Sequence, residues 1–269
     1  MKNKVVIITG ASSGIGKALA IDFAKQNATV VLAARNINEI DKLANQFKEQ
    51  GISCLAVKTD VSREEDCKFL IDKTVEQFGK IDILINNAGI SMRALFEEVE
   101  IEVIKKVMDV NFWGAVYMTK YALPYLLKTK GSVVGVSSIA GFKGLPARTG
   151  YSASKFALQG FLEVLRIENL KKGLHVLIAA PGFTSSNIRN TALAADGTQQ
   201  GESPRAEDKM MSSEEVAKHI VKAIKKRKKM LILTSQGKLT VWLNKFIPFT
   251  LDKMVYNHMA KEENSPLKK

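Results

Sequence analysis

The stretch VVIITGASSGIGKALA, residues 5–20, gives the first indication of how this chain folds. The apolar run Val5–Thr9 predicts a buried strand, a glycine-rich segment follows it directly, and a helical pattern covers Lys17–Gln26. Glycines let the backbone turn tightly and approach a phosphate, and the N-terminus of a helix favours negative charge. The spacing Gly-x-x-x-Gly-x-Gly therefore predicts a pyrophosphate-binding turn made of Gly10, Ser12, Ser13, Gly14, Ile15 and Gly16.

Short apolar runs alternate with longer amphipathic segments along most of the chain. The runs are rich in Val, Ile and Leu without polar alternation, as expected of parallel strands buried on both faces. The further strands predicted in this way are Thr29–Ala33, Cys54–Lys58, Ile81–Asn86, Ser132–Ser137, Leu174–Ala180 and Met230–Thr234. This repeated alternation predicts an α/β fold of the Rossmann type, a doubly wound, seven-stranded parallel sheet flanked by helices.

The segments between the predicted strands carry helix signals. Residues 40–47 hold a one-sided apolar stripe, and the helix predicted over residues 151–171 has apolar residues on more than one face, so that helix must be buried. Ser62 with Glu65, and Ser212 with Glu215, predict capping boxes that open two more helices.

The composition is that of an ordinary globular protein. The chain has 269 residues, 46% of them hydrophobic and 25% charged, which argues against disorder. Its two cysteines, Cys54 and Cys67, exclude a disulfide framework and a four-cysteine zinc site, and they fit a reducing compartment. His175, His219 and His258 lack zinc-ligand spacing, so we expect no metal.

Hydropathy and charge bear on location and partners. No apolar run approaches the roughly 18 residues of a membrane-spanning helix, and Met1–Thr9 has no signal-peptide layout, so we expect a cytoplasmic protein. The formal net charge is +13, with a basic run at residues 222–229. Such a run can bind an anionic surface, but cations also suit the C-terminus of a helix. Without a recognition motif, we expect no nucleic-acid partner.

Two regions interrupt the strand–helix alternation. Residues 183–212 are polar, contain Gly197, Gly201 and Pro204, and predict a functional lid or a disordered connection. Residues 235–269 mix aromatic and aliphatic side chains with lysines. We therefore divide the chain into a nucleotide-binding domain that includes the active site, residues 1–234, and a C-terminal amphipathic extension, residues 235–269.

The end of the second predicted strand bears on the cofactor. Sites for NAD usually place an acidic side chain here to accept a hydrogen bond from the ribose, whereas a nearby arginine accommodates the 2′-phosphate of NADP. This chain has Ala34 followed by Arg35. Because guanidinium and phosphate pair strongly, the sequence favours NADP(H) over NAD.

Several motifs together resemble the short-chain dehydrogenase/reductase family, in its compact branch. They are TGASSGIG at 9–16, Asp60-Val61 after the third strand, NNAG at 86–89, Asn111, Ser138, Tyr151-x-x-x-Lys155, and Pro181-Gly182 after the sixth strand. They occur in the order and spacing of the family and span residues 5–182. The C-terminal extension distinguishes this chain from the small members that end just after the seventh strand.

The resemblance implies a catalytic group of Asn111, Ser138, Tyr151 and Lys155. Tyr151 would give a proton to a carbonyl oxygen, and the ammonium of Lys155, four residues away on one helix face, would favour the phenolate and hold the ribose. Ser138 would orient the carbonyl, with Ser137 structural, and Asn111 would hold a water of the proton relay.

The resemblance also implies further cofactor contacts. Asp60 and Val61 would meet the adenine, while the pocket would be lined by Asn87, Ala88 and Gly89. Pro181, Gly182 and Thr184 would contact the carboxamide. Residues 183–212 would form the substrate lid, and its candidate substrate contacts are Asn187, Ile188, Arg189, Met210 and Met211.

The predicted activity is NADPH-dependent carbonyl reduction or alcohol oxidation on a small molecule. The extension favours a bulky lipophilic substrate, such as a 3-keto sphingoid base, a steroid-like ketone or a long-chain keto lipid. The alternatives are a reductase of a small polar ketone or 3-oxoacyl thioester, and a non-catalytic NADP-binding sensor. The family resemblance implies a homodimer or homotetramer, and the extension could cover the pocket, contact a membrane surface peripherally or pack on a partner subunit.

Overall fold

A computed structural model of the chain describes residues 1–201, 203 and 210–268. Its centre is a sheet of seven strands in the order β3-β2-β1-β4-β5-β6-β7, and every neighbouring pair is parallel. This confirms the predicted fold class. The strands are β1 (Val5–Thr9), β2 (Thr29–Ala34), β3 (Cys54–Lys58), β4 (Ile83–Asn86), β5 (Ser132–Val136), β6 (His175–Ala180) and β7 (Met230–Ile232).

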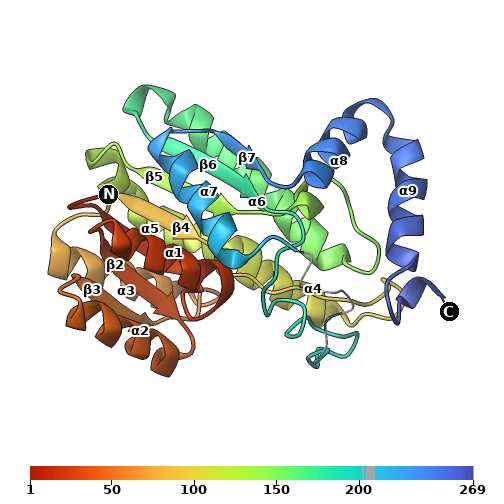
Figure 1. Cartoon of the computed structure of the whole chain (residues 1–269), viewed down its shortest axis with the longest axis horizontal. Coiled ribbons are helices and arrows are strands. Elements are labelled where there is room, and N and C mark those ends of the chain that lie inside the picture. The colour runs from red at the N-terminus through yellow and green to blue at the C-terminus, as the bar shows by residue number, and fades with distance from the viewer. Residues whose placement is uncertain (202, 204–209, 269) are drawn as a thin grey trace.

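Helices cover both faces of the sheet (Figure 1). On one face lie α1 (Gly14–Lys25), α2 (Ile37–Glu49) and α7 (Ser213–Lys225). On the other lie α3 (Glu64–Phe78), α5 (Gly114–Lys128) and α6 (Thr149–Glu168). Two elements lead into α5, namely α4 (Ile101–Met108) and the π-helical turn η1 (Asp109–Trp113). Short 3-10 turns are η2 (Ile139–Gly141), η3 (Leu170–Lys172) and η5 (Pro266–Lys268).

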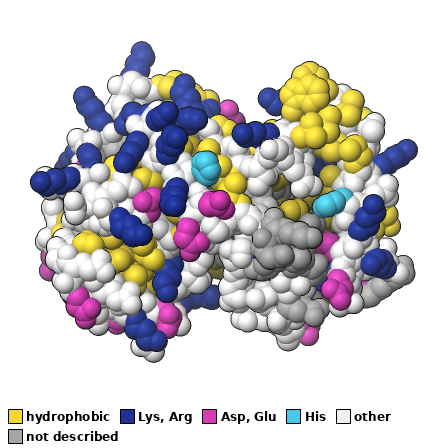
Figure 2. Space-filling view, viewed as in Figure 1, with side chains coloured by type: hydrophobic (Ala, Val, Ile, Leu, Met, Phe, Trp, Pro, Cys, Tyr) yellow, Lys and Arg dark blue, Asp and Glu magenta, His cyan; other side chains and the backbone are white. Residues whose placement is uncertain are grey.

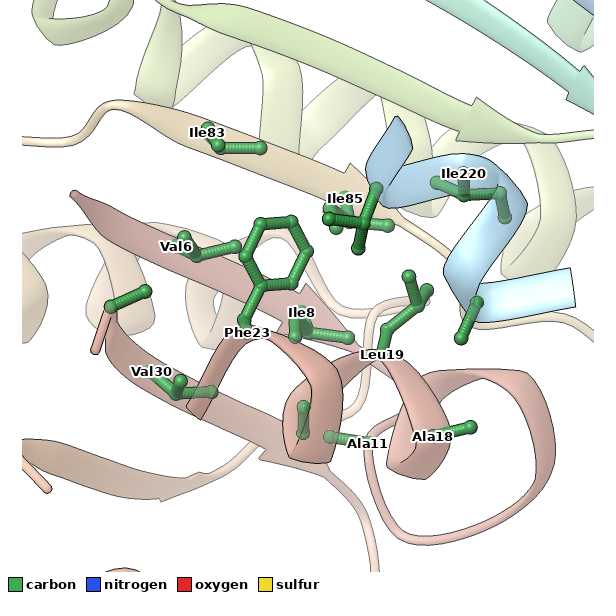
Figure 3. Close-up of a cluster of buried hydrophobic side chains, with 14 of the residues drawn as sticks. Val6, Ile8, Ala11, Ala18, Leu19, Phe23, Val30, Ile83, Ile85 and Ile220 are labelled. Atoms are coloured by element: carbon green, nitrogen blue, oxygen red, sulfur yellow. The ribbon is translucent and has the colours of Figure 1, made fainter. Parts of the chain in front are cut away.

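The core under α1 and α7 fixes the start of α1 against the carboxyl end of β1. Figure 3 shows Phe23 and Leu19 of α1 facing Ile8 and Ile85 of the sheet, with Ile220 of α7 beside them. These side chains have no exposed surface. Because burial of each large apolar side chain contributes about 1.5–3 kcal/mol, this cluster holds the glycine-rich turn between two rigid elements.

The two predicted capping boxes have different outcomes. The box of Ser212 and Glu215 is confirmed at the start of α7, where each side chain accepts a hydrogen bond from the backbone N–H of the other. The box of Ser62 and Glu65 is wrong, because α3 begins at Glu64 with Arg63 before it. The Ser62 hydroxyl instead donates to Asp60 Oδ1 over 2.7 Å. The Ser62 hydroxyl is therefore engaged by a nearby carboxylate and does not cap α3.

The C-terminal extension forms two helices, α8 (Ser235–Phe246) and α9 (Pro248–Ala260). They lie beyond β7, at the end of the molecule opposite β3, and are drawn in blue in Figure 1. Within the part of the chain that is described, no helix has the length and apolar character needed to cross a membrane.

Candidate active site

One large cavity, of about 1590 Å³, opens at the carboxyl ends of the strands. This is where ligands bind in open parallel sheets. All the residues predicted to bind the cofactor or act in catalysis line this cavity except Gly16 and Asn111. The chain segments that contribute to the lining extend from Gly10 to Glu263, so the cavity gathers groups that are distant in sequence.

The glycine-rich turn has a conformation that depends on its glycines. Gly10 and Gly14 have φ angles of +67° and +51°, a region that other residues adopt with strain. A Cβ on Gly16 would lie 2.2 Å from the carbonyl oxygen of Gly10. The start of α1 therefore lies directly against the end of β1, with Ser13, Gly14 and Ile15 in the cavity wall. The N-terminus of a helix favours a phosphate group at such a position.

Thr9 and Asn87 join the glycine-rich turn to the loop after β4. The Thr9 hydroxyl accepts hydrogen bonds from the backbone N–H groups of Asn87 and Ala88, each over 3.0 Å. The Asn87 amide donates to the carbonyl oxygens of Thr9 and Gly10 over 2.9 and 3.3 Å. Asn87 thus shapes the turn as well as lining the pocket. Thr9 belongs to the glycine-rich motif, but the motif alone indicates no role for its hydroxyl.

Two further cofactor candidates lie at the ends of β2 and β3. Arg35 is exposed at the mouth of the cavity, next to Asn36, whose side chain caps α2. The carboxylate of Asp60 turns into its own loop and accepts from both the backbone N–H and the hydroxyl of Ser62. Asp60 therefore stabilises the loop that carries Val61 into the cavity wall.

Tyr151, Lys155 and Ser138 face the cavity together. Lys155 Nζ lies 5.6 Å from the centre of the Tyr151 ring and donates to the carbonyl oxygen of Val136 over 3.0 Å. Lys155 is 4% exposed, and its burial lowers the pKa of the ammonium to about 8. Ser137 is buried and accepts a hydrogen bond from Gln159. Ser138, which follows Ser137 just after β5, lines the cavity, and its hydroxyl forms a hydrogen bond with Tyr151.

Two arginines, Arg148 and Arg189, act on the Tyr151 hydroxyl through their charges. Burial raises the pKa of Tyr151, while a hydrogen bond with Ser138 and the charges of Arg148 and Arg189 lower it. We expected Lys155 to provide this positive charge. Arg148 lies only three residues before Tyr151, directly before α6, and this closeness in sequence is a signal that could have identified it.

Asn111 lies behind the cavity wall, in the π-helical turn η1. Its Oδ1 accepts from the backbone N–H of Ile90 over 2.8 Å, and its Nδ2 donates to the carbonyl oxygen of Ile90 and to Ser154 Oγ, each over 2.9 Å. It is 2% exposed. Asn111 thus ties the segment after β4 to α6, and π-helical turns of this kind are frequent at functional sites.

The predicted lid folds over the cavity in its described part. Its candidate contacts Asn187, Ile188, Arg189, Met210 and Met211 all line the cavity. Arg189 is largely buried and donates to the carbonyl oxygen of Thr184 over 2.8 Å. Residues 202 and 204–209 of the predicted lid, Pro204 among them, lie outside the described residues.

The C-terminal helices supply the outer apolar wall. The residues that α8 and α9 contribute to the lining include Leu239, Leu243, Leu251, Met254, Val255 and Met259. Other apolar side chains of the extension point outward, among them Trp242, Phe246 and Phe249, which are 58%, 66% and 83% exposed. Figure 2 shows the resulting hydrophobic patch over these helices. Among the described residues, no group of His, Cys, Asp and Glu could hold a metal ion.

The sequence profile of the short chain dehydrogenases matches residues 4–197. The 11-beta-hydroxysteroid dehydrogenase-like 4A of Arabidopsis thaliana is 38% identical over 250 residues, which cover 92% of this chain and 82% of that protein. The 11-beta-hydroxysteroid dehydrogenase A of Sesamum indicum is 43% identical over 187 residues, or 69% of this chain. The match spans only about half, 53%, of that protein's length.

Two solved structures share the fold. An alcohol dehydrogenase from the archaeon Thermococcus sibiricus, complexed with 5-hydroxy-NADP, has a TM-score of 0.74 at 26% identity and covers 86% of this chain and 94% of its own. A short chain dehydrogenase/reductase from Burkholderia phymatum, in complex with NAD, has a TM-score of 0.80 at 25% identity and covers 91% and 93%.

The seven-stranded parallel sheet and the glycine-rich turn at its carboxyl edge are those of the Rossmann class of fold. The chain belongs to the short chain dehydrogenase/reductase family.

Proposed function

We propose that this protein is an NADP(H)-dependent carbonyl reductase or alcohol dehydrogenase that acts on a bulky, lipophilic ketone or secondary alcohol. The observation that carries the proposal is the position of Ser138, Tyr151 and Lys155 in the same cavity as the glycine-rich turn. The glycines that shape this turn, and the size of the cavity, fit a dinucleotide.

Each polar group of the site has a defined task in this proposal. The nicotinamide, when bound, supplies or accepts the hydride. The Tyr151 hydroxyl gives a proton to the carbonyl oxygen or takes it back, and the Ser138 hydroxyl donates a hydrogen bond that orients that oxygen. Lys155 binds the ribose through its ammonium group, and Asn111 holds the segment after β4 and a water of the relay. Residues 183–212 act as the substrate lid.

The preference for NADP(H) rests on Arg35. It follows Ala34 at the mouth of the cavity, where an enzyme specific for NAD would usually place an acidic side chain. Exposed at this position, the guanidinium can pair with a 2′-phosphate without losing much of its hydration.

Arg35→Ala should therefore weaken NADPH binding about tenfold, the lower end of what a hydrogen bond to a charged group contributes. NADH binding should be unchanged. Fluorescence titration of the two cofactors measures this, with Arg63→Ala, an exposed arginine outside the cavity, as the matched control. Equal losses for NADPH and NADH would contradict the assignment of Arg35 to the phosphate.

The lipophilic substrate is supported by the apolar wall that α8 and α9 add to the cavity. The curated relatives carry names of hydroxysteroid dehydrogenases, which fits a steroid-like ketone; a 3-keto sphingoid base or another long-chain keto lipid fits the same wall. A small polar ketone or a 3-oxoacyl thioester is the alternative within enzymes. A non-catalytic NADP sensor is the alternative of another class, and retention of Asn111, Ser138, Tyr151 and Lys155 argues against it.

The proposed function is tested by NADPH and NADH oxidation against short ketones, keto-steroids and long-chain 3-keto lipids. We expect turnover with NADPH on a keto-steroid or long-chain ketone and little on short ketones. Turnover on short ketones alone would favour the small-substrate alternative. Saturable NADPH binding without turnover on any member of the panel would favour the sensor.

The exposed apolar surfaces support two kinds of association. On α6, Phe156, Val164 and Ile167 are 47%, 54% and 57% exposed, which fits a homodimer or homotetramer formed through this helix. Light scattering at micromolar concentration tests this, and a monomer would contradict it. On the extension, Trp242, Phe246 and Phe249 lie among lysines, which fits peripheral contact with an anionic membrane. Cosedimentation with anionic phospholipid vesicles tests that contact.

A further inference from the structure

A buried ion-pair cluster joins the C-terminal extension to the wall of the active site. Glu262, just after α9, is paired with two arginines: its Oε2 lies 3.3 Å from Arg148 Nη2 and 3.6 Å from Arg93 Nη2. The three side chains are only 4%, 9% and 6% exposed, respectively. Ion pairs at this depth are poorly screened by water, in contrast to pairs on the surface.

Backbone contacts keep the three groups together. The N–H of Ala94 donates to the carbonyl oxygen of Ala147 over 3.0 Å, which places Arg93 and Arg148 side by side. Arg93 Nη2 donates to the carbonyl oxygen of Glu263 over 2.7 Å. Lys268 Nζ donates to the carbonyl oxygen of Glu262 over 3.0 Å. The cluster is therefore a fixed part of the tertiary structure, in which one carboxylate is shared by two guanidinium groups.

Arg148 connects this cluster to the reacting group. It directly precedes α6 as the N-cap residue and lies three residues before Tyr151. Arg148 also pairs with Ala94, which belongs to the buried cluster against which Tyr151 packs. Arg148 and Tyr151 both line the cavity. The charge of Arg148 lowers the pKa of Tyr151, against the effect of burial. Any group that positions or neutralises Arg148 therefore acts on Tyr151.

We propose that Glu262 is a positioning residue of the reaction, which holds the Arg148 guanidinium in place and balances its charge beside the Tyr151 hydroxyl. The inference rests on the proposed function in taking Tyr151 as the proton-transferring group. It assigns the extension a second role besides its apolar wall, since a residue at the end of the chain sets the charge at the catalytic tyrosine.

Other charged groups face the same region and are unchanged in the test. Lys155 and Arg189 lie around Tyr151, and Lys106, His258, Lys261 and Glu263 also line the cavity. Loss of the Glu262 carboxylate removes one negative charge from beside Arg93 and Arg148, so the phenolate form of Tyr151 becomes more favourable. Loss of the Arg148 charge makes the phenolate form of Tyr151 less favourable.

The experiment titrates Tyr151 directly by the ultraviolet absorbance of its phenolate, in the full-length protein without substrate. The chain has 5 tyrosines, so each titration is recorded as the difference between a protein and its Tyr151→Phe derivative. Glu262→Gln should shift the midpoint to lower pH, and Arg148→Gln should shift it to higher pH. Glu263→Gln, which removes the same charge from the exposed neighbouring residue, should titrate as the wild type.

Activity provides the second measurement. In ketone reduction, the alkaline limb of the kcat profile should move to lower pH in Glu262→Gln, while the KM for NADPH stays unchanged. Glu262→Asp, which restores the charge, should return the limb toward its wild-type position. A merely structural Glu262 would lower the unfolding temperature without moving either the titration midpoint or the limb.

The outcomes separate this inference from the proposed function. A midpoint that is the same in Glu262→Gln and Glu263→Gln, or that moves to higher pH in Glu262→Gln, overturns the inference even when Tyr151→Phe abolishes turnover. If Glu262→Gln does not fold, Arg148→Gln decides the question by its own shift. Absence of turnover on every substrate, with both midpoints shifted as expected, contradicts the proposed function alone.

Discussion

Replacement of Tyr151 by phenylalanine should lower kcat/KM for ketone reduction about 10²- to 10⁴-fold, the range that a positioned general acid contributes. The substitution removes only the hydroxyl, which Ser138 contacts, and keeps the ring, which packs against the buried cluster that includes Met92 and Leu193. The affinity for NADPH should therefore change little. Steady-state kinetics with NADPH and a substrate from the panel, together with a binding titration, measure the two quantities.

Tyr125→Phe is the matched control, because it removes a phenol hydroxyl from α5, outside the cavity. It should retain wild-type kinetics. If the kcat/KM of Tyr151→Phe equals that of Tyr125→Phe, Tyr151 is not the group that transfers the proton. A parallel loss of NADPH affinity would instead indicate that the Tyr151 hydroxyl contributes to cofactor binding as well as to proton transfer.

Gly16→Val should weaken NADPH binding about 100-fold, equivalent to about 3 kcal/mol of overpacking. A Cβ at this position would lie 2.2 Å from the carbonyl oxygen of Gly10 and 2.5 Å from Asn87 Nδ2, and the first of these atoms belongs to the backbone. The clash is relieved only if the start of α1 moves away from the end of β1. That movement displaces the N–H groups that would bind the pyrophosphate.

Gly144→Val provides the comparison for Gly16→Val. Gly144 is exposed and outside the cavity, and a Cβ there meets no atom within 4 Å, so this variant should bind NADPH as the wild type does. Isothermal titration calorimetry gives both affinities, and circular dichroism shows whether each variant is folded. Tight binding by a folded Gly16→Val protein would show that the turn tolerates a side chain, which would weaken its assignment as the pyrophosphate site.

The fold could be predicted almost entirely from local patterns. The extent of β1 and of β3 matches the predicted runs, because a continuous apolar stretch followed by a turn is a short-range signal. The start of α3 was predicted wrongly from an equally short-range pattern, the capping box, because the Ser62 hydroxyl donates to Asp60 instead of capping the helix. The order of the strands, with β1 between β2 and β4, is a property of packing that the alternation alone does not specify.

Part of the candidate site could likewise be predicted from the sequence, and part depends on the tertiary structure. The sequence by itself determined the family and the position of the glycine-rich turn, and it was enough to predict Ser138, Tyr151 and Lys155 as site residues, because those residues lie within short motifs of characteristic spacing. Only the tertiary structure decided that α8 and α9 wall the cavity and that Glu262 pairs with Arg148, 114 residues earlier. Such a contact leaves no periodic signal, because it depends on long-range packing that brings both chain segments out of water together.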